Sequence, residues 1–246
     1  MNRLKLLLII PFALQLCGCE KHEPPRIPNN AVVAERIDMA SIDADDIPQI
    51  FKSEGIEYNT VSFLNWPAYP YRPDVVFAVA HNGANLLIHY RVTEKRTLGT
   101  MVNDLDAVYK ESCCEFFCMD EGDSLYYNIE SNCLGAILME CGSGRAGRTV
   151  STVENLQSID RWASLGRESI GLREQETHWE LALVVPVTAF WRHDYGPLSG
   201  RTFLVNVYNC VGSGDNRQYV TWNPIDSPAP DFHRPEYFRR LYFNEK

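Results

Sequence analysis

The chain has 246 residues and a formal net charge of −9 at pH 7. An acidic surface repels nucleic acid phosphates and gains nothing from anionic lipid headgroups, so neither is an expected partner. The hydrophobic share of 45% is enough for one domain with a sizeable core, and the acidic balance suits a neutral ligand or a bound cation.

The N-terminus resembles an export signal. A short basic region precedes an apolar run over residues 6–16, which has the length of a signal-peptide core and is shorter than the roughly 20 residues that cross a membrane. The run ends in Leu16-Cys17-Gly18-Cys19, which resembles the bacterial lipobox. By that resemblance residues 1–18 are a lipoprotein signal peptide and Cys19 carries the lipid. The chain is then exported and lipid-anchored to the bacterial cell envelope, at the outer membrane. The alternative is an ordinary secretory signal with two incidental cysteines.

Residues 19–35 are polar and contain three prolines. Prolines disfavour packed structure and favour an extended chain, so this segment is expected to be a tether. Residues 36–246 then form one domain.

Short apolar and β-branched runs recur along that domain, separated by turn residues, as in an all-β sandwich or barrel. We expect an antiparallel β-sandwich of the jelly-roll or immunoglobulin-like kind, with one or two short helices at 186–191 and within 150–164. The expected strands are 60–66, 75–80, 85–93, 113–119, 125–132, 136–140, 178–185, 201–210, 219–222 and 240–243.

The stretch 112–133 predicts a hairpin. Gly122 stands at the first central position of Glu121-Gly122-Asp123-Ser124, which favours a two-residue type II′ turn. That turn places Phe116 opposite Ile129 on the core side. It places Glu115 opposite Glu130 on the other side, together with Asn128. Two carboxylates directly opposite each other repel, so a cation, a basic group, a shared proton or a sugar is expected to compensate, unless both simply reach solvent.

Beyond the signal, six cysteines remain, and the sequence cannot choose among their possible pairings. Several lie inside predicted strands, where a free cysteine behaves as a small apolar residue. One disulfide is the alternative. No CxxC pair is present, so the spacing gives no zinc motif.

Several separated motifs resemble family 9 carbohydrate-binding modules and their relatives among exported Bacteroidetes-type lipoproteins. They cover roughly residues 58–244 in the expected order. The segments that carry the resemblance are Asn65-Trp66, Tyr69–Pro73, Tyr109–Phe117, Tyr126–Asn132, Val220–Pro224 and Asp231–Phe238.

The resemblance implies a β-sandwich in which two aromatic side chains hold one sugar ring between them. Tyr109 precedes Glu115 by six residues, the spacing of the family's first aromatic and its sugar-binding glutamate. Trp222 matches the second aromatic, on a late strand. We therefore expect carbohydrate to bind Tyr109, Glu115, Asn128, Glu130 and Trp222. The motif around His233 is expected to fold the C-terminus onto the sandwich.

The sequence departs from the family where Tyr109 replaces the usual tryptophan, and where Asn128 and Glu130 stand in a strand that often carries an arginine. The sugar preference of other members therefore does not transfer. The resemblance also allows a structural calcium ion, for which Asp104, Asp106 and Glu111 could supply oxygens.

The expected function is thus non-catalytic binding of an oligosaccharide or polysaccharide, in support of glycan capture or degradation beside glycan-degrading enzymes. One alternative is a protein-interaction module of a surface glycan-capture complex. Another is a glycoside hydrolase that uses Glu115 and Glu130, although a shallow sheet face gives little means of raising one pKa.

Overall fold

A computed structural model describes residues 28–246. The expected signal peptide, Cys19 and most of the tether lie outside the described residues. Within residues 28–246, no helix is long and apolar enough to cross a membrane.

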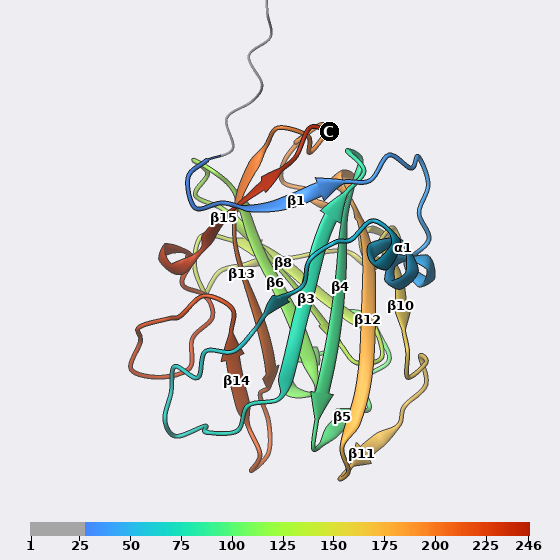
Figure 1. The fold of residues 1–246 in the computed structure, drawn as a ribbon. Coiled ribbons are helices and arrows are strands. Elements are labelled where there is room, and N and C mark those ends of the chain that lie inside the picture. The colour runs from blue at the N-terminus through green and yellow to red at the C-terminus, as the bar shows by residue number, and fades with distance from the viewer. Residues whose placement is uncertain (1–27) are drawn as a thin grey trace, which may run out of the picture.

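Two sheets pack face to face (Figure 1), which confirms the predicted sandwich. The first sheet contains β10 (Asp160–Ala163), β12 (Thr177–Pro186), β4 (Asn85–Glu94), β3 (Asp74–His81) and the short β2 (Asn59–Thr60). The second contains β15 (Arg239–Phe243), β13 (Thr202–Val211), β6 (Cys113–Asp120), β7 (Tyr126–Asn132), β8 (Ile137–Gly142), β9 (Thr149–Val150) and, beside β13, β14 (Gln218–Thr221). Strands β5 (Thr97–Gly99) and β11 (Gly171–Arg173) form a small separate pair.

Strand β1 (Val32–Arg36) joins the two sheets, because it pairs in parallel with both β3 and β15. The folded part of the chain therefore begins before residue 36, and the predicted end of the tether at residue 35 was too late. The apolar run Val32-Val33-Ala34 is short and follows a polar stretch, so the sequence pattern did not predict a strand there.

Helices are few and short, as expected. They are α1 (Ile47–Ser53), α2 (Val153–Gln157) and single 3₁₀ turns at Ala44–Asp46, η2 (Val108–Lys110), Val187–Ala189 and η4 (Pro235–Tyr237). The helix expected at 186–191 is only a 3₁₀ turn. The segment 150–164 holds α2 and also β10, and the expected strand at 60–66 ends at Thr60 apart from one bridge at Phe63.

The β6–β7 hairpin has the predicted register. Phe116 pairs with Ile129, and Glu115 pairs with Glu130. The predicted turn type was wrong, since β6 ends at Asp120 and β7 begins only at Tyr126. Asp123 N donates to Asp120 O at 3.0 Å, and Gly122 has φ of 95°, so glycine occupies the third position of a type II turn.

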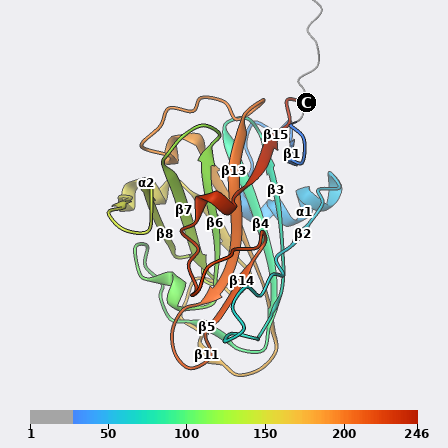
Figure 2. The same ribbon diagram turned by 90° about the vertical axis from the view of Figure 1, so that its left-hand side faces the viewer.

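Side chains that alternate along these strands form two different buried layers. Phe116 and Ile129 lie in the main core between the sheets. Phe117 and Tyr126 point to the outer face of the second sheet, where a second cluster covers them. Figure 2 shows the C-terminal segment with η4 crossing outside β6, β7 and β13. The ring of His233, in that segment, lies 5.0 Å from that of Phe117, in agreement with the expected packing of the C-terminus.

The six cysteines within residues 28–246 are all buried and free. The prediction of buried free thiols is confirmed, and the alternative of one disulfide is not observed among them.

Candidate functional site

A cavity of about 450 Å³ opens on the outer face of the second sheet, beside the C-terminal segment. We call it the Tyr109 cavity. Its lining comes from η2, β6, β7, β8, β13, β14 and the segment before η4, and includes Leu105, Ala107, Tyr109, Glu115, Glu130, Leu138, Glu140, Arg145, Cys210, Gly212, Tyr219, Pro230, Asp231, Phe232 and His233. Three of the five predicted sugar-binding residues, Tyr109, Glu115 and Glu130, thus meet in one place.

Tyr109 forms one wall and is held there through its backbone. Gly212 N donates to Tyr109 O at 2.8 Å, and Ser213 Oγ donates to Lys110 O at 2.7 Å, so the end of β13 fixes η2. A side chain at Gly212 would place its Cβ 2.7 Å from Tyr109 O, which explains the glycine. The Tyr109 ring is 40% exposed and contacts no other aromatic ring among the described residues.

Tyr219, on β14, also lines the cavity and is half-buried. Its ring lies 4.9 Å from that of Tyr69 and 6.0 Å from that of Phe232, both edge to face. Phe232 in turn stacks on Tyr208 at 4.2 Å. The contacts with Tyr69 and Phe232 therefore hold the Tyr219 ring in a fixed position at the cavity wall.

Trp222 does not reach the Tyr109 cavity, contrary to the prediction. It is 5% exposed, packs in the core between the sheets, and its ring contacts Phe77 at 5.2 Å. Side chains alternate along a strand, so Trp222 points to the face opposite that of Tyr219. The expected pairing of Tyr109 with Trp222 is therefore corrected, and Tyr219 is the late-strand aromatic that shares a cavity with Tyr109.

Glu115 and Glu130 form the floor, and they are 2% and 4% exposed. Burial raises the pKa of Glu115 well above its usual range, and contact with Cys210 raises it further. Burial also raises the pKa of Glu130 well above its usual range, and repulsion from Glu115 adds to it. The pair therefore retains protons at a pH where exposed glutamates have lost theirs.

Asn128 lies behind the floor rather than in the cavity, and it is fully buried. Its amide Nδ2 donates to Glu130 Oε1 at 2.8 Å, while its Oδ1 accepts from Arg148 Nη2 at 2.6 Å. The Arg148 guanidinium also stacks over the Tyr126 ring, 4.1 Å from its centroid. Asn128 is thus a positioning residue for Glu130, and its predicted direct sugar contact is not supported by this geometry.

The glutamate pair leads to a prediction about stability. In the folded state the raised pKa of Glu130 keeps a proton that the unfolded chain releases above about pH 4.5. This contribution to the free energy of unfolding is complete below that pH and is lost as pH rises through the folded pKa. Glutamine has the shape of glutamic acid but does not titrate. Glu130→Gln should therefore reduce the loss of unfolding free energy with rising pH by up to roughly 1.4 kcal/mol per pH unit. Urea unfolding of both proteins from pH 5 to 8, with chelator present, measures this. If the free energy of unfolding changes with pH in the same way for both proteins, the pKa of Glu130 is the same in the folded and unfolded states, which would contradict this prediction.

Two larger hollows, of about 670 and 800 Å³, lie elsewhere on the described surface. The first is lined mainly by loops around Tyr71 and Arg217, and the second mainly by β1 and the segment 54–59 that contains Tyr58. Neither has a buried carboxyl group in its lining, whereas the Tyr109 cavity combines an exposed ring with two of them. The Tyr109 cavity is therefore the better candidate for specific binding.

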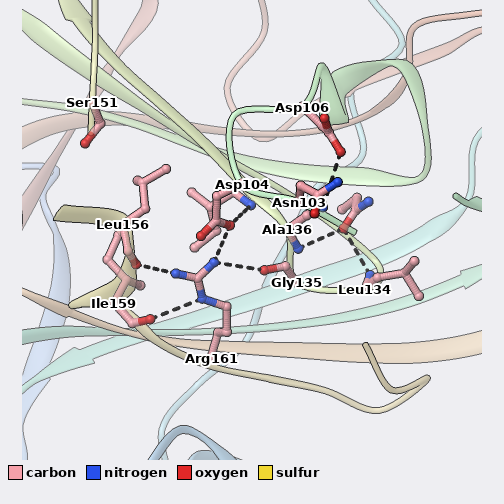
Figure 3. Close-up of polar contacts among 12 residues, drawn as sticks. Asn103, Asp104, Asp106, Leu134, Gly135, Ala136, Ser151, Leu156, Ile159 and Arg161 are labelled. Carbon is pink, nitrogen blue, oxygen red and sulfur yellow. Dashed lines mark hydrogen bonds and ion pairs between the residues drawn. The ribbon is translucent and has the colours of Figure 1, made fainter. Parts of the chain in front are cut away.

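The residues considered for calcium do not fit that ion (Figure 3). Asp104 Oδ1 accepts from Arg161 Nη1 at 2.6 Å, so an arginine already supplies the positive charge there. Asp106 accepts from Asn103 N at 3.2 Å. Glu111 accepts from the backbone of Thr100 and Met101 and from the side chain of Asn132. The three carboxylates thus bind different partners and do not form one oxygen cage.

Tyr219, Arg148 and His233 border or support the cavity, and the sequence did not assign them to it. Tyr219 lay inside a predicted strand whose inner face was unknown. Arg148 comes from the loop between β8 and β9, for which no pattern predicts a contact with Asn128. His233 Nδ1 lies 2.9 Å from the Tyr126 hydroxyl, and burial lowers the pKa of this histidine to about 3, so it is neutral.

Comparisons with known proteins agree on one family. The family model described as "Carbohydrate-binding family 9" matches residues 45–243. A Bacteroides uniformis protein to which carbohydrate binding has been attributed is 34% identical, with 87% of this chain and 99% of that chain covered and a TM-score of 0.84. No functionally curated protein matches the chain.

Two further solved structures are family 9 modules from Caldicellulosiruptor kristjanssonii. One is a complex with glucose, at 10% identity and a TM-score of 0.53, covering 88% of this chain and 96% of that one. The other is a complex with cellotriose, at 9% identity and a TM-score of 0.54, covering 88% and 94%. At such identities the likeness concerns the fold alone.

Proposed function

The chain belongs to carbohydrate-binding family 9, and on that premise we propose that it binds an oligosaccharide in the Tyr109 cavity without cleaving it. The observation that carries the proposal is the meeting of an exposed tyrosine ring with two buried carboxyl groups in one cavity. The cavity's volume of about 450 Å³ lies within the usual range for small-ligand sites.

Each side of the cavity suits a different part of a sugar. The C–H face of a pyranose ring packs on an aromatic ring, and Tyr109 and Tyr219 offer such surface on the walls. The hydroxyl groups need donors and acceptors, which Glu115 and Glu130 provide on the floor. A protonated carboxyl both donates and accepts, so the raised pKa of each glutamate matches a hydroxyl better than a bare carboxylate pair would.

The same pair argues against hydrolysis. A retaining glycosidase needs one ionised carboxylate as nucleophile and one protonated acid, so its two environments must push the pKa values apart. Here burial raises the pKa of both Glu115 and Glu130. We expect no new reducing ends when the protein is incubated with a glycan that it binds.

Calorimetry with a panel of glycans tests the proposal. Glucose and cellotriose are suitable first ligands, since they are the ligands in the two solved family 9 complexes. We expect saturable binding of at least one glycan with one site per chain. If no glycan binds the folded protein, the module instead serves protein–protein contacts in a glycan-capture complex.

The proposal includes export and a lipid anchor, supported by Leu16-Cys17-Gly18-Cys19. Anchored in this way, the domain would hold glycan near envelope enzymes that degrade it. Cys19→Ser should move the protein from the membrane fraction to the soluble fraction, because no lipidated residue would remain, whereas Cys17→Ser should stay in membranes. Cell fractionation and mass spectrometry of the mature N-terminus measure this. An unmodified Cys19 in the wild-type protein would contradict the anchor.

A further inference from the structure

Cys113 and Cys210 are far apart in the sequence but directly opposite each other in the β6–β13 ladder. Glu115 lies two residues beyond Cys113 on β6, so its side chain is on the same face. The two sulfur atoms and one Glu115 carboxylate oxygen all lie within 4.8 Å of one another. The cluster is at the floor of the Tyr109 cavity, which Cys210 and Glu115 line.

The surroundings of this cluster are unusual for apolar cysteines. Cys113 and Cys210 are 0% and 2% exposed, and Cys210 Sγ donates to Glu115 Oε1 at 3.0 Å. Glu130 is directly opposite Glu115, and its Oε2 is buried with no hydrogen-bond partner among the described residues 28–246. Burying a polar atom without a hydrogen-bond partner costs free energy. A ligand that binds this oxygen would remove that cost, which is a physical reason for the oxygen to be buried here.

We propose that Cys113, Cys210 and Glu115 bind one thiophilic divalent cation of the zinc class, with Glu130 as the fourth ligand. In a tetrahedral zinc site the ligand atoms lie roughly 3.4–3.8 Å apart, so the present cluster needs only small side-chain shifts. Glu130 is not part of the 4.8 Å cluster, so its side chain must turn to become the fourth ligand. Its Oε1 accepts from Asn128, and Oε2 is the oxygen left without a partner among residues 28–246. Such outer contacts orient metal ligands.

The chemistry favours a soft cation over calcium. Binding converts both thiols to thiolates and both glutamic acids to carboxylates, so it releases four protons to solvent. The two sulfur charges offset the charge of the ion, and the two carboxylates leave the site with a net charge of −2. Burial raises the pKa of the Cys113 thiol, and the hydrogen bond with Cys113, followed by burial, raises the pKa of the Cys210 thiol. Thiolates select zinc-class ions, whereas calcium requires oxygen ligands. The cavity offers a route to Cys210 and Glu115 from solvent. The metal site shares Glu115 and Glu130 with the proposed sugar site. Because Co²⁺ binding is measured without sugar, metal binding and sugar binding can each fail while the other is observed.

Titration with Co²⁺ and then Zn²⁺ tests the proposal, using the full chain, fully reduced and stripped with chelator. We expect one Co²⁺ per chain with sulfur-to-cobalt charge-transfer absorption, and displacement of Co²⁺ by Zn²⁺. Cys113→Ala with Cys210→Ala should abolish this binding. The matched control is Cys118→Ala with Cys141→Ala, which removes two other buried thiols and should bind as the wild type does. Both double variants retain Cys17 and Cys19.

Glu115→Gln keeps both thiols and the fold, and it should weaken Co²⁺ binding at least about tenfold through loss of a charged ligand. Three results would overturn the proposal. The first is that the reduced wild-type protein binds no Co²⁺, and the second is that the Cys113/Cys210 variant binds it as well as the control. A Cys113–Cys210 disulfide that persists in the natively purified protein and excludes metal would overturn it as well.

Discussion

Tyr109→Ala is expected to weaken oligosaccharide binding by at least about thirtyfold, which corresponds to about 2 kcal/mol. The ring is the exposed aromatic wall of the cavity, and alanine removes its whole stacking surface. The fold should not suffer, because the contacts that hold this residue use its carbonyl oxygen. Calorimetry with the best-binding glycan measures the loss.

The controls for this prediction separate binding from folding. Tyr109→Trp enlarges the stacking surface and should preserve or strengthen binding. Trp222→Phe changes a core ring outside the cavity, so it should lower the melting temperature and leave the affinity of the folded protein nearly unchanged. Tyr219→Ala should weaken binding as Tyr109→Ala does. If Tyr109→Ala binds normally while Trp222→Phe does not, the cavity has been assigned to the wrong aromatic pair.

Arg161→Ala should cost about 3–5 kcal/mol in the free energy of unfolding, the usual loss when one partner of a buried ion pair is removed. The Arg161 and Asp104 side chains are only 7% and 13% exposed, and their charged atoms are 2.6 Å apart. The guanidinium also donates to the carbonyl oxygens of Ile159 and Gly135 (Figure 3). Urea denaturation compares the variant with the wild type.

Asp104→Asn in the Arg161→Ala background should recover part of this loss, since no unpaired carboxylate would then be buried. Calcium should leave the stability of the wild type unchanged, because Arg161 already occupies the site. A calcium-dependent rise in the wild-type melting temperature that disappears in Asp104→Asn would contradict this account and restore the ion suggested by the family resemblance.

The hairpin around Gly122 shows what could be predicted from sequence. Two strands joined by a short loop have few registers, and only one puts Phe116 and Ile129 together on the core side. The register and the Glu115–Glu130 pair were predicted from a turn centred on Gly122 and Asp123, and the alternation of inner and outer side chains supported them. The turn type could not be predicted, because loops of about two, four or six residues all allow the same register.

Side-chain alternation along the strand could not predict on which face of the second sheet Trp222 lies. Both faces of the second sheet are covered, one by the first sheet and one by the C-terminal segment. An apolar pattern therefore does not reveal which side of β14 is inside, and Tyr219 and Trp222 are equally plausible from sequence. The larger ring fills the core between the sheets.

The meeting of Cys113 with Cys210 could not be predicted for a different reason. Strands β6 and β13 pair in the sheet, but nearly the whole middle of the chain separates them. No turn sets their register, so a contact between two particular residues depends on packing across the domain. The same holds for β1, whose partners β3 and β15 come from distant parts of the chain.

A crystal structure of the protein with its best-binding oligosaccharide tests the central claim most directly. The account predicts a sugar ring in the Tyr109 cavity, between Tyr109 and Tyr219, with hydroxyl groups bound by Glu115 and Glu130. Sugar bound in the hollow around Tyr71 and Arg217 while the Tyr109 cavity holds only water would contradict it.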